Sequence, residues 1–272
     1  MKCILLPFLL ASAGCSCGGG EPEPQPQRPP VPPQSRSVSE ARERSGGASG
    51  PVDPQPIDPA STGSIRGVVF FDGEAPERKP IRVEAVGGCK SEHEVLTEQV
   101  IVNDGRLQNA FVYVKRGLEG WIVPPAPSTQ AVLVQKGCVY QPHVQGIRVG
   151  QILRVKNEDP ASHNVNARPR RRKNESFNQL QPMNGADLSR VFGEQEVAIR
   201  FECNIHPWMN AYVAVVVHPF FAVSAADGSF ELTGLPPGEY ELEAWHEEYK
   251  RASAHVTVLA GRSAEAEFTF SP

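Results

Sequence analysis

The chain has 272 residues, and its 27 Lys and Arg against 31 Asp and Glu give a formal net charge of −4 at pH 7. No basic face with interleaved aromatic residues occurs, so the composition argues against a nucleic-acid partner. About two hundred residues follow the Pro- and Gly-rich N-terminal region, enough for two small β domains or one large one.

The N-terminus has the pattern of an export signal. Lys2 supplies a positive start, residues 4–10 form a short apolar run, and small residues precede Cys15 in the order of a lipobox. The apolar run is too short to span a bilayer. We expect a signal peptide over 1–14 and lipidation of Cys15, although the small residues 11–13 also fit a conventional cleavage site. The sequence therefore predicts an exported lipoprotein, periplasmic or on the surface of a bacterial envelope, held at the membrane by its lipid.

Residues 15–62 are expected to be a disordered linker. The stretch 18–60 is rich in Pro, Gly, Glu, Gln and Ser and has no aromatic residue. Such a composition cannot bury enough apolar surface to fold. Its Pro content favours an extended, semi-rigid spacer between the lipid and the folded part.

From residue 64 the hydrophobic pattern is that of β-strands, and no run of useful length has the helical period. Val, Ile and Phe are dense over 64–71, which lead into the turn pair Asp72-Gly73. The expected strands are 64–71, 80–86, 99–103, 107–115, 131–135, 147–149, 152–156 and 211–217, with a loop at 121–128. The predicted fold class is all-β.

A group of metal-binding residue types lies in the C-terminal half. Apolar and polar residues alternate over 197–203, which places Cys203 on the apolar face of a strand. Cys203, His206 and Met209 follow the spacing C-x2-H-x2-M, and His163 stands forty residues upstream beside Asn164. Two imidazoles, one thiolate and a weak thioether form the ligand set of a type 1 copper ion. A buried Cys is more often a small hydrophobe, so the whole set, not the C-x2-H alone, carries the prediction.

These motifs resemble the cupredoxin family, most closely the amicyanins, over about 131–217. The resemblance implies a cupredoxin-like antiparallel β-sandwich with one type 1 copper ion at one end. It carries over His163, Cys203, His206 and Met209 as ligands, with the Asn164 N–H donating to the Cys203 sulfur. It also implies that the ring edge of His206 reaches the surface.

A basic run, absent from the family pattern, follows His163. It consists of Arg168, Arg170, Arg171, Arg172 and Lys173. We expect it on a loop near the copper end, where positive charge would steer an acidic redox partner; the alternative is a solvated loop without a role.

The C-terminal region has a pattern of its own. Asp227-Gly228 and the LPPGEY stretch at 235–240 separate half-buried strands, and alternation continues over 264–270. This resembles the carboxypeptidase regulatory-like module, a transthyretin-like β-sandwich. Its usual first strand is most similar to 63–71. We therefore expect the copper domain, 131–217, to be inserted between the first strands of that module, in 63–130, and the remaining strands, in 218–272; a tandem order is the alternative.

The remaining cysteines and histidines have structural interpretations. With Cys203 assigned to metal, Cys89 and Cys138 are left to form a disulfide, the alternative being two buried thiols. His143, His218 and His246 lie beside apolar stretches. We expect them to be hydrogen-bonded histidines at the domain junction and not a second metal site.

Three classes of function remain. The leading one is a lipid-anchored copper protein that transfers single electrons to a redox protein partner and is not an enzyme. The second is a non-redox module that sequesters copper or binds zinc through His163, Cys203 and His206. The third is a structural envelope-binding β protein. A cysteine-nucleophile enzyme would need an exposed thiolate with an orienting partner.

Overall fold

The computed structural model describes residues 53–83, 88–89 and 94–272, all of which lie in one compact unit, Ser49–Pro272. The predicted signal peptide, Cys15 and most of the predicted linker lie outside the described residues. Among the described residues, no helix is long and apolar enough to cross a membrane.

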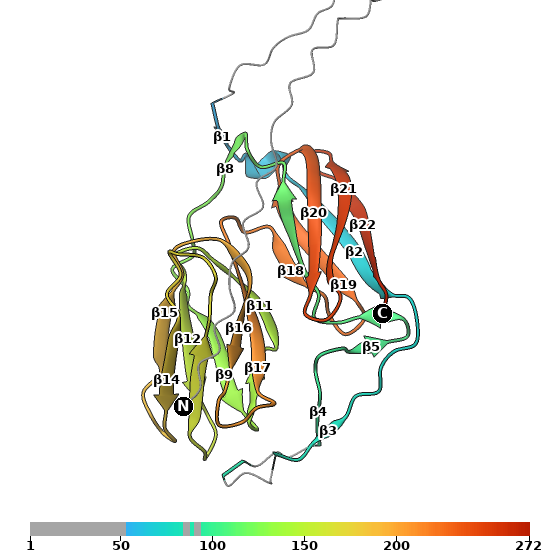
Figure 1. Ribbon diagram of the computed structural model, residues 1–272. Coiled ribbons are helices and arrows are strands. Elements are labelled where there is room, and N and C mark those ends of the chain that lie inside the picture. The colour runs from blue at the N-terminus through green and yellow to red at the C-terminus, as the bar shows by residue number, and fades with distance from the viewer. Residues whose placement is uncertain (1–52, 84–87, 90–93) are drawn as a thin grey trace, which may run out of the picture. The chain divides into compact units, whose positions relative to one another are not determined.

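The fold is all-β, as predicted, and its strands form two sandwiches (Figure 1). A short 3-10 turn, η1 (Pro59–Ser61), precedes the first long strand and is capped by the Asp58 side chain. We call the sandwich built from residues 131–216 the inner sandwich. The outer sandwich is built from strands that lie before and after it in the chain.

The inner sandwich has a four-stranded and a five-stranded sheet. The four-stranded sheet has the order β10 (Val139–Gln141), β9 (Ala131–Lys136), β12 (Ile152–Asn157) and β15 (Leu188–Val191). The five-stranded sheet has the order β11 (Val144–Arg148), β17 (Asn210–Val216), β16 (Glu196–Glu202), β13 (His163–Ala167) and β14 (Phe177–Gln181). Each sheet contains one parallel pair, β9–β12 and β11–β17, so the sandwich is mixed and not purely antiparallel as the resemblance implied. Apolar residues from both sheets, among them Leu133, Val155 and Phe201, form its fully buried core.

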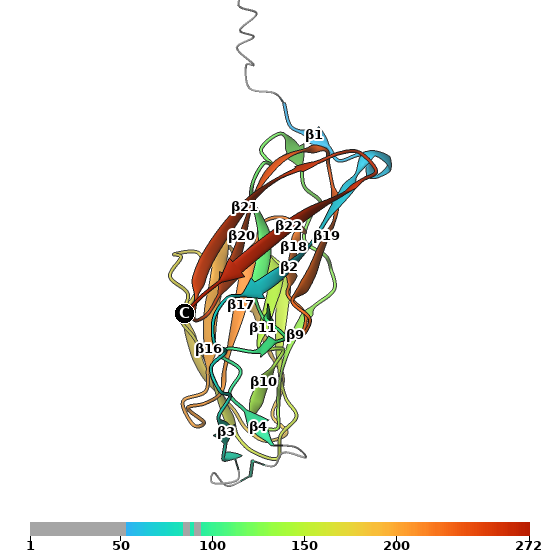
Figure 2. The same cartoon turned by 90° about the vertical axis from the view of Figure 1, so that its right-hand side faces the viewer.

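The outer sandwich combines strands from both sides of the inner one. Its first sheet has the order β18 (Phe221–Val223), β7 (Phe111–Arg116), β20 (Gly238–His246) and β21 (Lys250–Val258). The second has the order β19 (Ser229–Leu235), β2 (Gly63–Phe71), β6 (Arg106–Leu107) and β5 (Val102–Asn103), with β22 (Ser263–Phe270) beside β2 (Figure 2). Strands before residue 131 thus pair with strands after residue 217.

Four two-residue strands complete the list. β1 (Gln55–Pro56) pairs in parallel with β8 (Trp121–Ile122), and β3 (Pro80–Ile81) pairs with β4 (Val95–Leu96). The loop prediction for 121–128 was therefore wrong at its first two residues. The strand predicted at 107–115 is interrupted because Asn109 has a φ of 66° and donates its N–H to the Ser224 carbonyl.

His218 and His246 are buried histidines whose surroundings favour the neutral ring. The His218 Nε2–H donates to the Val114 carbonyl at 2.7 Å, while Nδ1 accepts the Phe220 N–H at 3.3 Å. Both ring nitrogens are therefore satisfied without a second proton. Burial lowers the pKa of His218 to about 4, and burial lowers the pKa of His246 to about 4 as well.

We expect acid to destabilise the protein through these histidines. Because the pKa of His218 is lower in the folded than in the unfolded chain, only the unfolded chain takes up the proton as the pH falls below 6.5. This difference costs about 2 kcal/mol of folding free energy between pH 7 and pH 5. Urea unfolding at both pH values should show that His218→Gln loses less stability than the wild type between pH 7 and pH 5, by about that amount, while His246 keeps its own share. Equal pH dependence in both proteins would contradict this account.

Candidate metal centre

The C-x2-H-x2-M segment is a short closed loop between two paired strands. β16 ends at Glu202, and Cys203 follows it on the buried side of the sheet. The Cys203 N–H donates to the Met209 carbonyl at 3.1 Å, and the Met209 N–H donates to the His206 carbonyl at 2.9 Å. These bonds fold the loop back on itself, so β17 begins directly beside the end of β16.

β13 brings His163 to the same place. It runs antiparallel to β16, with Asn166 opposite Glu202, so its first residue, His163, lies just beyond the end of β16. His163 is thus the first residue of a strand. His163 Nδ1 lies 2.9 Å from His206 Nδ1, and the Cys203 sulfur lies 3.6 Å from His206 Nδ1.

The expected hydrogen bond to the sulfur is present. The Asn164 N–H donates to the Cys203 sulfur at 3.4 Å. The Asn164 side chain also accepts the Asn204 N–H at 3.1 Å, which ties the start of β13 to the ligand loop. Among the described residues there are three sets of three side chains whose potential ligand atoms all lie within 4.8 Å of one another. One of these sets is His163, Cys203 and His206. The structure thus brings the three predicted nitrogen and thiolate ligands together.

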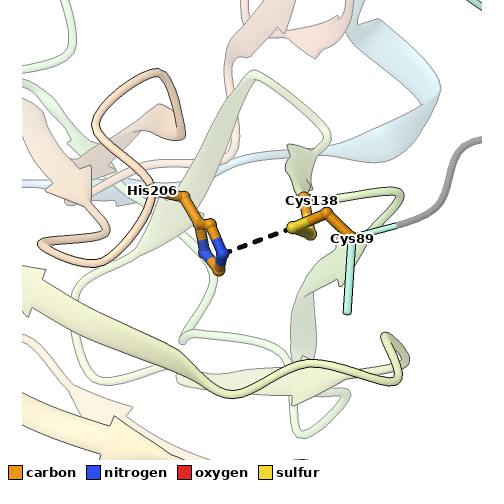
Figure 3. A group of neighbouring side chains, drawn as sticks. All are labelled: Cys89, Cys138 and His206. Carbon is orange, nitrogen blue, oxygen red and sulfur yellow. Dashed lines mark hydrogen bonds between the residues drawn. A yellow bond between two sulfur atoms is a disulfide. The ribbon is translucent and has the colours of Figure 1, made fainter. Parts of the chain in front are cut away.

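All four predicted ligands are buried. His163 is 0% exposed, His206 and Met209 are 1% exposed, and Cys203 is 3% exposed. The expectation that the His206 ring edge reaches the surface was therefore wrong. The physical reason is that the Cys89–Cys138 disulfide covers the His206 ring. The Cys89 sulfur lies 3.3 Å from His206 Nε2 (Figure 3).

Sequence reasoning missed Asp159. This carboxylate is 5% exposed and accepts His163 Nε2–H at 2.8 Å, together with the N–H groups of Gly137 at 2.6 Å and Cys138 at 3.0 Å. The bond holds the His163 ring with Nδ1 facing His206 and Cys203. The available signal was an acidic residue four positions before a predicted ligand, in the turn that follows a strand.

The electrostatics favour an ionised thiol. Burial raises the pKa of Cys203, but hydrogen bonds from His163, from the Asn164 N–H and from the ligand loop outweigh it, and the pKa lies below its usual value. Burial lowers the pKa of His163, but the hydrogen bonds and charges of Asp159 and Cys203 raise it overall. For His206, burial and then the neighbouring His163 both lower the pKa. Metal ligation requires a thiolate and neutral imidazoles. The shifts of Cys203 and His206 go in that direction, whereas His163 would have to give up its proton to a bound metal.

The structure splits the basic run: Arg168 pairs with the carboxylate of Glu202, the residue before Cys203, at 3.7 Å, whereas Arg170 and Arg171 lie at the other end of β16. The N–H groups of Arg170 and Arg171 donate to the Glu196 carboxylate at 2.6 and 3.2 Å, and Glu196 is the first residue of β16. Cys203 follows the other end of that seven-residue strand, which is about 20 Å away at 3.3 Å per residue. The prediction was therefore wrong for Arg170 and Arg171, because β13 leads the chain away from His163 before it reaches them.

The other histidines are held by hydrogen bonds. His143 Nε2 pairs with the Glu247 carboxylate, and His246 Nδ1 accepts the Glu248 N–H at 3.3 Å. Together with His218, they have the structural partners that the sequence interpretation expected.

Comparisons with known proteins support the β-module assignment. Residues 205–271 match the family model of the carboxypeptidase regulatory-like domain. This match begins inside the ligand loop, so it includes β17 of the inner sandwich and leaves out β2 and β7. A comparison with curated proteins gives no match.

Solved structures similar to this chain include copper proteins. A purple cupredoxin from Nitrosopumilus maritimus matches with 23% identity and a TM-score of 0.27, over 32% of this chain and 99% of that one. A point mutant of amicyanin, in the Cu(I) form, matches with 18% identity and a TM-score of 0.29, over 32% and 81%. A copper-containing nitrite reductase from Thermus scotoductus SA-01 matches with 14% identity and a TM-score of 0.28, over 54% and 28%. The chain is thus an all-β protein whose residues 205–271 match the carboxypeptidase regulatory-like domain family.

Proposed function

We propose that the inner sandwich binds one copper ion of the type 1 class and carries single electrons. The observation that carries this proposal is the buried convergence of His163, His206 and the low-pKa Cys203 thiol, with Met209 in the same closed loop. Copper bound by such a set would supply reversible exchange between Cu(II) and Cu(I).

The surrounding residues would hold one geometry in both oxidation states. Cys203 and Met209 are tied to each other through the backbone, and His163 is tied to Asp159. Cys203 directly follows β16, Met209 directly precedes β17, and both side chains belong to the buried core of the inner sandwich. Little rearrangement would then accompany the gain or loss of an electron.

The same burial argues against the competing functions. A cysteine nucleophile must meet its substrate, and Cys203 is 3% exposed. A catalytic zinc ion keeps an open position for water, whereas Met209, buried in the same loop, offers a thioether, a ligand that suits copper better than zinc. Sequestration of copper without electron transfer remains the second candidate because it uses the same ligands.

Metal loading combined with voltammetry tests the proposal. The metal-free protein is offered Cu(II) or Zn(II) in equal amounts, and bound metal is measured after dialysis. The proposal predicts one copper per chain and a reversible one-electron wave. Copper that is bound but passes no electrons reversibly would favour sequestration, and preferential zinc binding would contradict the proposal.

Met209→Gln should keep the copper and lower its reduction potential. An amide oxygen binds more strongly along the axial direction than a thioether and favours the oxidised ion. Voltammetry of the loaded variant measures the shift. The matched control is Met183→Gln, since Met183 is 51% exposed and lies in a turn before β15; a similar shift in both variants would remove Met209 from the ligand set.

The location proposed for this function comes from the sequence. A lipid on Cys15 and the linker 15–62 would hold the folded part near the outer face of a bacterial membrane, where a redox protein partner could reach it. Mass spectrometry of the membrane-extracted protein should find the lipid on Cys15, and Cys15→Ala should release the protein into the soluble fraction. An unmodified Cys15 in a membrane-bound protein would contradict this.

A further inference from the structure

The Cys89–Cys138 disulfide closes off the outer nitrogen of one predicted ligand. His206 Nδ1 faces His163 and Cys203, and Nε2 faces the Cys89 sulfur at 3.3 Å (Figure 3). At 1% exposure the ring is shielded from bulk solvent. The ring is therefore fixed in one orientation, with Nε2–H directed at sulfur, a weak acceptor, and the Nδ1 lone pair directed at the other ligands.

Cys138, the second cysteine of the disulfide, is linked to His163 through Asp159. Gly137 and Cys138 form the two-residue turn between β9 and β10, and both have positive φ values, 67° and 55°. Positive φ at both central positions is characteristic of a tight hairpin turn, and it is uncommon for a residue with a side chain. The turn directs its two N–H groups at the Asp159 carboxylate, whose own bond holds His163 Nε2.

The ligand loop also attaches to this turn. Trp208 donates its indole N–H to the Cys138 carbonyl at 2.8 Å, and its ring packs against His206 with centroids 5.4 Å apart. Cys138 is thus linked to three residues of the site. Its N–H donates to Asp159, which binds His163; its carbonyl accepts the Trp208 indole N–H; and the sulfur of its disulfide partner, Cys89, contacts His206. A cross-link that served stability alone could lie anywhere along the chain, whereas this one contacts the predicted ligands on both sides.

We propose that the Cys89–Cys138 disulfide, with Asp159, is a positioning element of the metal centre that orients both imidazole ligands. This inference rests on the proposed metal-binding function. It predicts that the cross-link sets the properties of the bound metal and not only the stability of the fold. Loss of such outer contacts typically lowers metal affinity by about 10- to 100-fold.

Two variants test the two contacts separately, that of the disulfide with His206 and that of Asp159 with His163. Cys89→Ala combined with Cys138→Ala removes the contact to His206, and Asp159→Asn weakens the hold on His163. Each should bind Zn(II), which has no redox chemistry, about 10- to 100-fold more weakly than the wild type in a chelator competition. Each should also shift the visible band and the reduction potential of the copper form. If the double variant fails to fold, Asp159→Asn decides the outcome alone.

A stability control separates positioning from folding. Leu242→Ala removes a fully buried side chain from the outer sandwich and lowers stability without touching the ligands. It should leave zinc affinity, spectrum and potential unchanged. In the Zn(II) form of the wild type, ¹⁵N NMR should show His206 with its proton on Nε2.

The outcomes are distinguishable from failure of the proposed function. If the wild type binds neither copper nor zinc, the proposed function fails. If it binds metal and both variants keep wild-type affinity, spectrum and potential, the function stands and the positioning role is overturned.

Discussion

Cys203→Ser, loaded with Cu(II), should lose all of the intense visible absorption that the wild type is expected to show. That absorption requires charge transfer from a thiolate sulfur to the metal, and Cys203 is the one free cysteine among the described residues. Serine replaces the sulfur with a hydroxyl that stays protonated near neutral pH. Copper affinity should fall as well, because two imidazoles and a thioether remain.

The control for Cys203→Ser is a measurement showing that the variant still folds. Serine is close to cysteine in size, so far-UV circular dichroism should be unchanged in the metal-free variant. A variant that is folded and still absorbs intensely when loaded would show that another group binds the copper through sulfur.

Gly67→Ala should destabilise the protein more than any other single methyl addition in the outer sandwich. A Cβ at Gly67 would lie 1.8 Å from the Ala266 carbonyl oxygen and 2.6 Å from the Phe230 ring. β2 is paired with β19 on one side and with β22 on the other, so the backbone at this point cannot move away. We expect a loss on the order of 3 kcal/mol, the upper range for overpacking.

Gly120→Ala is the matched control for this prediction. No atom lies within 4 Å of a Cβ built at Gly120. Urea unfolding should therefore show a stability near that of the wild type for Gly120→Ala and a large loss for Gly67→Ala. A small loss at Gly67 would mean that β2 and β22 are not held in the register described.

Strands could be predicted from the sequence where one face of the strand is buried and the other is exposed. Over 264–270 each inward residue is apolar and each outward one is polar, and β22 follows that alternation. The short pairs β1–β8 and β3–β4 were not predictable because two residues are too few to show a period. Their pairing depends on which distant segments the fold brings together.

The sequence predicted that His163, Cys203 and His206 come together, but it did not predict what surrounds them. The spacing of Cys203, His206 and Met209 is local, and a hairpin between β16 and β17 is enough to place them. Asp159 and the Cys89–Cys138 disulfide act across the sandwich, so their role emerges only when the β9–β10 turn is seen beside the ligands. Arg170 and Arg171 were misplaced for the same reason, because their position along the sheet depends on the length and direction of β13.

The visible spectrum of the wild-type protein loaded with one equivalent of Cu(II) tests the central claim most directly. Coordination by the Cys203 thiolate together with His163 and His206 predicts an intense absorption in the red that disappears on reduction and returns on oxidation. A colourless or only faintly absorbing protein with copper bound would contradict a type 1 centre at these residues.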